Sequence, residues 1–269
     1  MTRKFRAILL VAVGMASIAA AEPRQPTGRW VVNFDAAQCI ASRNYGTADN
    51  PLFLALKSPP LGSVVQVGVI RPGQGGATTQ LDGEFAIDQR TPLRTSILAF
   101  TAKKLKRRAY WINLPIEDFA PVRSARVISI RAKGELDERF ETSAIAPLMK
   151  IMDDCVADLR KVWSVTEGDA IGPNLKQPVS GDLRGVINDW DYPAVAMAED
   201  QSGTVTLALL IDETGRVADC SVIGTSGAAS LDAQSCGVLK ERARFKPAIG
   251  LDGKPAKGSF IQRITWRTS

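Results

Sequence analysis

The chain contains no histidine among its 269 residues. This absence excludes a Ser-His-Asp triad, a Cys-His nucleophile pair and any metal site built on imidazole. The sequence also lacks a GxxxxGK[ST] phosphate loop, and the glycines at 73–76 do not have the strand–turn–helix setting that such a loop requires. A lysine-activated Ser226 is the one nucleophile that the residues leave open. We therefore predict a non-enzymatic protein with no cofactor and no metal.

Long apolar runs are also scarce. The exception is residues 7–21, which follow the basic residues Arg3, Lys4 and Arg6 and end in three alanines. A membrane-spanning helix needs about 20 apolar residues, whereas a basic start, a short apolar run and small residues at its end are typical of a secretory signal peptide. We predict a signal peptide over residues 1–21, cleaved after Ala21, and an exported mature chain. The alternative is a protein anchored to the inner membrane by an uncleaved N-terminal segment.

The excess of positive charge belongs to the first half of the chain. The formal net charge is +6, and removal of residues 1–21 leaves +3. Residues 191–269 hold equal numbers of basic and acidic side chains, so nucleic acid is not an expected partner of that part. The densest basic stretch contains Lys103, Lys104, Lys106, Arg107 and Arg108. One interpretation is contact with anionic lipid head groups or an acidic partner; the other is a solvated charged loop.

The first part of the mature chain has the pattern of short strands separated by glycine and proline. Strands are predicted over residues 29–34, 39–45, 52–56, 64–70, 84–87, 95–100 and 126–130. Such a series is typical of an all-β sandwich or a partial barrel. A helix is predicted over residues 144–163, because apolar residues recur there at helical spacing. We expect this helix to close a β-rich domain that spans residues 22–163.

Residues 192–266 predict a second, smaller unit. Residues 204–211 alternate between apolar and mostly smaller side chains, which is typical of a strand with one buried face. Gly215 suits a short hairpin loop, from which residues 217–225 return. A helix follows, with Ser230 as its expected N-cap, and then a last strand over residues 259–267. The pattern predicts a three-stranded antiparallel sheet with packed helices.

The order of short motifs in this unit resembles the C-terminal domain of TonB-family proteins. The motifs are Tyr192-Pro193, Gly203-Thr204-Val205, Gly215-Arg216-Val217, Ser226-Gly227, Leu231-Asp232 and Arg244-Phe245-Lys246-Pro247-Ala248. The resemblance does not extend to the N-terminal half. Together with the strand pattern of the first half, it predicts an α+β chain in which the β-rich domain is followed by a linker over residues 164–189 and a TonB C-terminal-like domain over residues 190–269.

The resemblance implies a periplasmic protein that binds a protein partner. In the family, this domain captures an extended peptide of an outer-membrane receptor, and the peptide adds as a strand to the edge of the sheet. No later strand of this chain follows the last one to cover that edge, so Ile261, Arg263 and Thr265 are expected to flank a docked peptide. Trp190 and Asp191 fall in a segment that can also touch the receptor in the family.

The chain departs from the energy-transducing members of the family. Those carry an uncleaved N-terminal helix with an important histidine and a long proline-rich spacer, whereas the linker here contains only Pro173 and Pro178. We predict strand-addition binding of an envelope or outer-membrane partner, in receptor-dependent transmembrane transport. The alternative is an envelope structural or assembly protein that uses the module for protein–protein interaction without energy transduction.

Four cysteines, at positions 39, 155, 220 and 236, allow three pairings. An even number of cysteines in an exported protein suggests disulfide bonds, and there is no CxxC motif to suggest redox or metal chemistry. Since each predicted domain holds one pair, we favour Cys39–Cys155 within the first domain and Cys220–Cys236 within the second.

Overall fold

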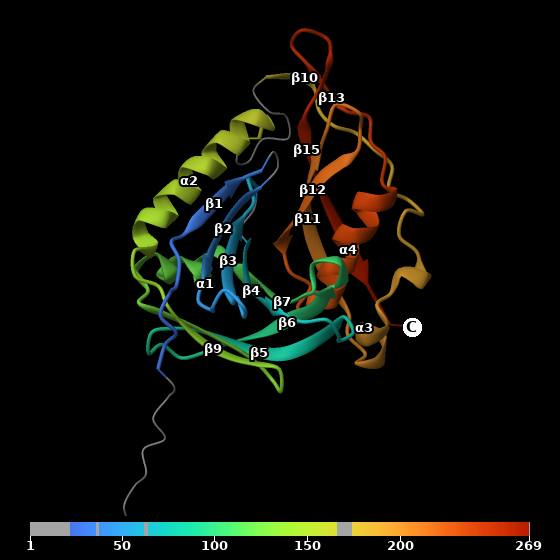
Figure 1. The fold of residues 1–269 in the computed structure, drawn as a ribbon. Coiled ribbons are helices and arrows are strands. Elements are labelled where there is room, and N and C mark those ends of the chain that lie inside the picture. Colours follow the sequence, from blue (N-terminus) through green and yellow to red (C-terminus); the bar gives the residue numbers. More distant parts are fainter. Residues whose placement is uncertain (1–21, 36–37, 62–63, 166–173, 269) are drawn as a thin grey trace, which may run out of the picture.

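The structure is a computed structural model that describes residues 22–35, 38–61, 64–165 and 174–268, so the expected signal peptide over residues 1–21 lies outside the described part. Figure 1 shows a large curled sheet with one long helix on its left and a smaller sheet with its own helices on its right. The fold is therefore mixed and rich in strands. None of the helices in the described ranges is long and apolar enough to span a membrane.

The large sheet is antiparallel throughout, and its nine strands lie in the order β1-β2-β3-β4-β7-β6-β5-β8-β9. The strands are β1 Val31–Phe34, β2 Cys39–Asn44, β3 Phe53–Ser58, β4 Val64–Pro72, β5 Thr79–Ile87, β6 Leu93–Ala102, β7 Arg107–Pro115, β8 Val127–Ala132 and β9 Leu136–Glu141. Between β7 and β8 lie the short helix α1, Ile116–Phe119, and a 3-10 turn, Ala120–Ser124.

The first residues of the described chain bring the two ends of this sheet together. The N–H of Arg24 donates to the carbonyl of Arg139 at 2.7 Å, and the carbonyl of Arg24 accepts from the N–H of Glu141 at 3.0 Å, both beside β9. Just beyond β2, the hydroxyl of Tyr45 donates to the carbonyl of Glu141 at 2.7 Å, and its ring meets Phe140 edge-on. Burial raises the pKa of Tyr45 to about 12. These contacts hold the curl of the sheet.

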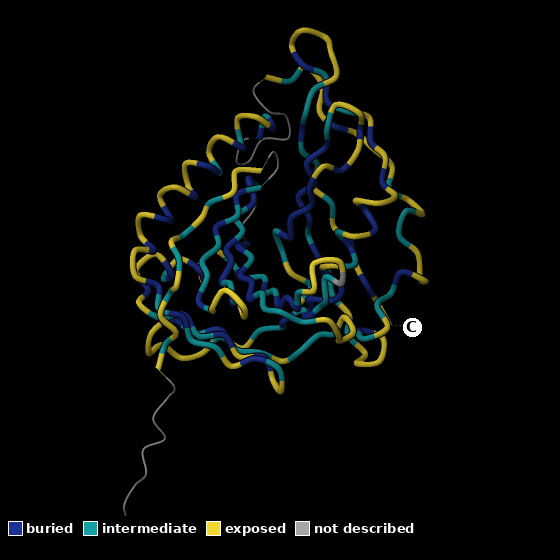
Figure 2. The backbone as a smooth tube through the Cα atoms, viewed as in Figure 1, coloured by how far each residue is buried: buried dark blue, intermediate teal, exposed yellow. Residues whose placement is uncertain are grey.

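Helix α2, Ile145–Val162, packs against the curled sheet near β1 and β2. Its apolar side joins the core of the large sheet, and parts of α2 and of the neighbouring strands are coloured as buried in Figure 2. A disulfide bond between Cys39 of β2 and Cys155 of α2 crosses this core. The predicted helix over residues 144–163 is thus present with nearly the same ends.

The architecture is not the two-sheet sandwich; it is a single curled sheet whose two ends are brought together, which is close to the expected partial barrel. Two strands, β7 and β9, were not predicted. In β7 every second residue is buried, but the series begins with a charged residue, Arg108, before Tyr110, Ile112 and Leu114. In β9 charged residues separate the two buried ones. Charge therefore concealed the alternation that identifies a strand.

The C-terminal module consists of a three-stranded antiparallel sheet in the order β12-β11-β15, with helices packed on one face. Its elements are α3 Ala194–Ala198, β11 Gly203–Ile211, β12 Val217–Gly224, α4 Ala229–Arg242 and β15 Gly258–Trp266. Cys236 of α4 is bonded to Cys220 of β12. Gly215 has a positive φ of 79° in the β11–β12 hairpin, and an added Cβ would lie 2.0 Å from the carbonyl of Phe245. Only glycine fits this turn.

Helix α4 begins at Ala229, with Ala228 rather than the expected Ser230 in the N-cap position, and no side chain of its own caps it. Its first two N–H groups are bound by the large sheet instead. The N–H of Ala229 donates to Oγ of Ser96 in β6 at 3.2 Å, and the N–H of Ser230 donates to Oε1 of Gln80 in β5 at 3.1 Å. The N-terminal domain therefore supplies the acceptors that a helix N-terminus needs, which a sequence pattern within the helix cannot reveal.

Part of the expected linker, residues 164–189, packs with the module. β10, Leu175–Gln177, pairs with β13, Ala248–Gly250, in a small sheet that also contains β14, Pro255–Ala256. Val179 is buried in the core of the module. Residues 166–173 lie outside the described part.

Candidate partner-binding surface

The outermost strand of the small sheet is β15. One side of β15 pairs with β11 along its whole length, from Gly258 opposite Ile211 to Trp266 opposite Gly203. The strand order places no other strand of the described chain on its second side. The opposite edge of this sheet, β12, contacts β4 of the N-terminal domain. Within the described residues, β15 therefore presents the open edge of the module.

The side chains of β15 divide between two faces. Ile264 and Trp266 are buried, and Nε1 of Trp266 donates to Oγ of Ser235 in α4 at 2.9 Å. Ile261, Arg263 and Thr265 lie on the other face and are exposed, with Ile261 at 50%. The three residues expected to flank a docked peptide thus share one accessible face of the edge strand.

One hydrogen bond of β15 indicates which of its backbone groups point to the open side. The carbonyl of Arg263 accepts a hydrogen bond from the side-chain amide of Gln262 at 2.6 Å, in an exposed position. In an antiparallel strand, the N–H and C=O groups of alternate residues point to the same edge. This bond indicates that Ile261, Arg263 and Thr265 turn their backbone groups away from β11, toward the open side.

A second exposed feature lies at the end of this strand. The turn Asp189–Asp191 begins with a capping box, in which Oδ1 of Asn188 accepts from the N–H of Trp190 at 3.0 Å. This leaves Trp190 with 96% of its surface exposed. The residue that follows this turn, Tyr192, packs edge-on against Trp266 of β15, with ring centroids 5.3 Å apart. The turn that carries Trp190 is thereby joined to the C-terminal end of β15.

Asp191 lies in a different environment from Trp190. Its side chain is buried and accepts hydrogen bonds from Nη1 and Nη2 of Arg242, at 2.9 and 2.8 Å. These bonds, with a further bond from the N–H of Asn188 that also stabilises the charge, hold the pKa of Asp191 below its ordinary value against the opposing effect of burial. The carboxylate is therefore engaged within the molecule, where it fixes the turn that presents Trp190.

This C-terminal part has a counterpart among known families. Residues 189–268 match the family model of the Gram-negative bacterial TonB protein C-terminal. The match confirms the resemblance that the motifs indicated. It covers the three-stranded sheet of the module and its helices α3 and α4, and stops short of the N-terminal domain. No match to the chain was found among curated proteins or among solved structures.

The TonB C-terminal domain is a protein-interaction domain without catalytic activity, and it points to an envelope protein. One of its motif residues here, Asp232, is buried at the start of α4. Its carboxylate accepts from the hydroxyls of Thr225 and Ser226, each at 2.7 Å, and from Nδ2 of Asn113 in β7 at 3.0 Å. Asp232 therefore fixes the β12–α4 loop of the TonB C-terminal domain and binds it to the large sheet.

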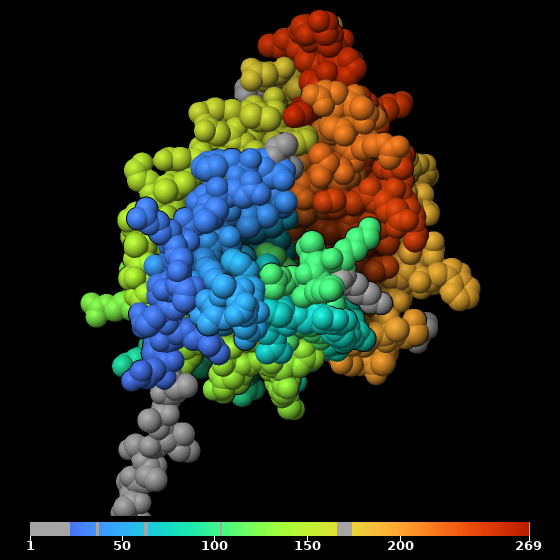
Figure 3. Space-filling model, in the orientation of Figure 1, coloured from blue at the N-terminus to red at the C-terminus, as the bar shows by residue number. Residues whose placement is uncertain are grey.

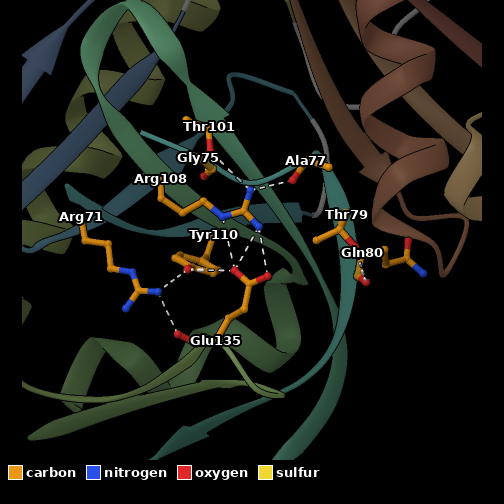
Figure 4. A network of polar contacts seen from close by, with 9 residues as sticks. All are labelled: Arg71, Gly75, Ala77, Thr79, Gln80, Thr101, Arg108, Tyr110 and Glu135. Carbon is orange, nitrogen blue, oxygen red and sulfur yellow. Dashed lines mark hydrogen bonds and ion pairs between the residues drawn. The ribbon is translucent and has the colours of Figure 1, made fainter. Parts of the chain in front are cut away.

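The basic stretch at residues 103–108 forms the turn between β6 and β7, and its members differ in role. Figure 4 shows Arg108 inside a polar network. Its guanidinium contacts both oxygens of Glu135 and donates to the carbonyl of Ala77 at 2.7 Å. Arg71 approaches the same network and donates to the hydroxyl of Tyr110 at 2.6 Å. Arg108 is only 6% exposed, so it holds the β4–β5 loop and is not available to a membrane.

The rest of this stretch remains at the surface. Lys104 and Lys106 are exposed, Arg107 is half-buried, and Lys103 lies in the same turn. Leu105, between the two exposed lysines, is also exposed. The surface available to an anionic partner is therefore the tip of the β6–β7 hairpin without Arg108.

Sequence reasoning missed two residues that shape the candidate surface. Arg242, which fixes Asp191, lies 51 positions away along the chain. Gln262 was assigned no role because the expected contacts were the exposed alternate residues. Neither partner follows from spacing alone, since both depend on which elements meet in space.

Proposed function

We propose that this protein binds an envelope protein partner by accepting an extended segment of that partner as a fourth strand beside β15. The support is the position of β15 at the open edge of a TonB C-terminal domain. Main-chain hydrogen bonds to an edge strand provide affinity, and alternate side chains provide specificity. Ile261, Arg263 and Thr265 would flank the added segment on the exposed face.

Trp190 extends this surface beyond the strand. A fully exposed tryptophan held on a fixed turn offers a large contact area to a partner at little cost in conformational entropy. Its turn is joined to β15 through Tyr192 and Trp266. We assign Trp190 as a side-chain anchor and Asp191 as the residue that positions its turn.

A role in receptor-dependent transport through the outer membrane follows from the family resemblance. A second candidate, an envelope assembly protein without energy transduction, is favoured by the docking of the module. Ser96, Gln80 and Asn113 of the N-terminal domain bind α4 and its preceding loop. A module held in this way is presented on a fixed platform and not on a long free spacer.

The experiment is site-specific photo-crosslinking in the intact envelope. A photoreactive phenylalanine analogue replaces Ile261, and a matched control places it at Lys150, an exposed position on α2. We expect a discrete crosslinked partner from position 261 and none of the same mass from position 150. If position 261 gives no crosslink in cells that express outer-membrane receptors, the assignment of β15 as the binding edge is contradicted.

Proline substitutions then separate main-chain from side-chain recognition. Proline cannot donate a backbone hydrogen bond. Arg263→Pro should abolish the crosslink while leaving the circular dichroism spectrum unchanged, because the N–H of Arg263 points to the open side. Arg263→Ala should retain it. Gln262→Pro should instead weaken the fold, since its N–H belongs to the ladder with β11. A folded Arg263→Pro variant that still crosslinks would exclude strand addition here.

A further inference from the structure

A cavity of about 410 Å³ lies between the two domains. Figure 3 shows the corresponding hollow between the blue N-terminal strands, the green β6–β7 hairpin and the orange-red module. Its volume falls within the range of about 300–1,000 Å³ that is usual for small-molecule sites. The lining includes Ile40, Leu98, Phe100 and Trp111 from the large sheet, and Val222 and Ala233 from the module.

Trp111 forms much of the apolar floor. It pairs directly with Gly68 across β4 and β7, and an added Cβ at Gly68 would lie 2.7 Å from the indole ring. The indole therefore lies flat on the glycine backbone instead of standing out from the sheet. Leu98, its cross-strand neighbour in β6, and Phe100 extend this surface. All three side chains are half-buried, so the floor is apolar and still reachable.

One end of the cavity is charged. Lys57 of β3 is 13% exposed, and its Nζ lies 3.6 Å from Oδ2 of Asp219 in β12. Lys240 of α4 approaches the other oxygen of Asp219 at 3.3 Å. Oδ2 of Asp219 is buried and accepts no hydrogen bond from the described residues. Two ammonium groups thus share one buried carboxylate.

Lys57 is poorly compensated in this position. Burial lowers its pKa, the attraction of Asp219 and of the more distant Asp35 only partly opposes this effect, and the charge of Lys240 adds to it. A buried ammonium with so few partners is costly. An anion in the cavity would supply the missing partner.

The remaining charges do not favour a cation. Asp232 also lines the cavity, but hydrogen bonds from Thr225, Ser226 and Asn113 already occupy its carboxylate. The green β6–β7 hairpin borders the hollow in Figure 3, and Lys104 and Lys106 of this hairpin are exposed. The approach to the cavity is therefore positive.

We propose that this cavity binds a single-chain amphiphilic anion, with the apolar chain on Trp111, Phe100 and Leu98. The anionic head would lie beside Lys57 and Lys240, whose two positive charges exceed the single negative charge of Asp219. A fatty-acid carboxylate has this chemistry. A neutral apolar molecule would leave the charge of Lys57 without a further partner, and a cation would be repelled by Lys57 and Lys240. Because both domains line the cavity, the bound molecule would also join them.

The test is calorimetric titration of the mature chain with sodium decanoate below its micelle concentration. We expect saturable binding of one decanoate per chain, and at least a tenfold weaker affinity for Lys57→Met. Lys150→Met, at an exposed lysine on α2, should bind as the wild type does. Decyltrimethylammonium, with the same chain and the opposite charge, should not bind. Equal binding of the two amphiphiles, or an unchanged affinity in folded Lys57→Met, would overturn the proposal.

A second arm distinguishes a free amphiphile from a membrane surface. Vesicles of phosphatidylglycerol are offered to the wild type, to Lys57→Met and to Lys104→Glu/Lys106→Glu. If decanoate binding depends on Lys57, the proposed site in the cavity is supported, whether or not the protein also binds vesicles. Vesicle binding that depends only on the hairpin lysines, together with no decanoate binding, would replace the cavity with a surface contact. A fluorine label on Trp111 should shift on decanoate addition and stay unchanged with decyltrimethylammonium.

Discussion

Arg242 donates hydrogen bonds to both carboxylate oxygens of Asp191 through its two terminal guanidinium nitrogens. This contact links the turn before α3 to the last turn of α4. The charge of Asp191 is stabilised mainly by those hydrogen bonds, which lower its pKa. An unfolded aspartate titrates near pH 3.9. The stabilisation is therefore fully present above that value and is lost as the pH falls through the lower pKa of the folded state.

Arg242→Met should remove this contribution. We expect urea unfolding to show a lower free energy of unfolding than the wild type at pH 7, and a difference that shrinks as the pH is lowered toward 3. Arg184→Met is the control, because Arg184 pairs with Asp182 at a strongly exposed site and should matter little. An Arg242→Met deficit that stays constant from pH 7 to pH 3 would disprove the linkage.

Asp232→Ala should destabilise the module by about 3 kcal/mol, because three hydrogen bonds to its buried carboxylate, from the hydroxyls of Thr225 and Ser226 and the N–H of Ser226, are lost. Thr225→Val removes one of these donors and should cost less. Chemical denaturation followed by circular dichroism measures both. Asn113→Leu tests the contact between domains separately, and its effect should be smaller than that of Asp232→Ala. A smaller loss for Asp232→Ala than for Thr225→Val would contradict this assignment.

The two disulfide bonds should differ in their contributions. Cys220–Cys236 closes a segment with a sequence separation of 16, and Cys39–Cys155 one of 116. In the chain-entropy description, loss of the first costs about 3 kcal/mol and loss of the second about 4.7 kcal/mol. Paired Cys→Ala variants, unfolded in urea, measure the two costs. Peptide mapping without reductant verifies the pairing, and a bridge between Cys155 and Cys220 would exclude it.

The expected cleavage of the signal peptide offers a further prediction. Cleavage after Ala21 would leave Arg24 near the new N-terminus, where it pairs with Glu138 and bonds the backbone of β9. We expect intact-mass measurement on envelope protein to show a chain that begins at Glu22. Deletion of residues 22–27 should then lower the thermal unfolding temperature, because it uncovers the β9 edge. A species that retains residues 1–21 would restore the anchored alternative.

The C-terminal module was the more readable half from sequence, because its strands follow a clear period of two. In the interval from Val205 to Ile211 the residues of the expected inner face are fully buried, but Ala208 and Leu210 on the other face are buried as well, and Leu210 joins the core of the large sheet. The exposed positions of Ile261, Arg263 and Thr265 followed from the same rule. The short motifs were therefore sufficient for the strands and helices of this unit, whereas the N-terminus of α4 and the second face of β11 depend on contacts with the large sheet.

The N-terminal half was less readable for a physical reason. Arg108 is a buried charge whose partner, Glu135, comes from the turn before β9, and its pairing makes a charged residue part of an inward-facing strand. Lys57, near the end of the apolar strand β3, is likewise a largely buried charge, and its partner Asp219 comes from the other domain. In a sequence pattern, a charged residue predicts a solvent-exposed position. Such a pattern cannot identify a partner that only the folded chain brings near.

The first two N–H groups of α4 are bound by side chains of the N-terminal domain, and this limits how the two domains can be separated or recombined. A module cut out at its family boundary would carry a helix whose first two N–H donors have lost Ser96 and Gln80. Transplanting it to another carrier would require a host with two acceptors at matching positions, or a new serine or aspartate in place of Ala228. Recombination should therefore transmit the two halves as a pair, and lineages that separated them would be expected to have rebuilt this one helix end.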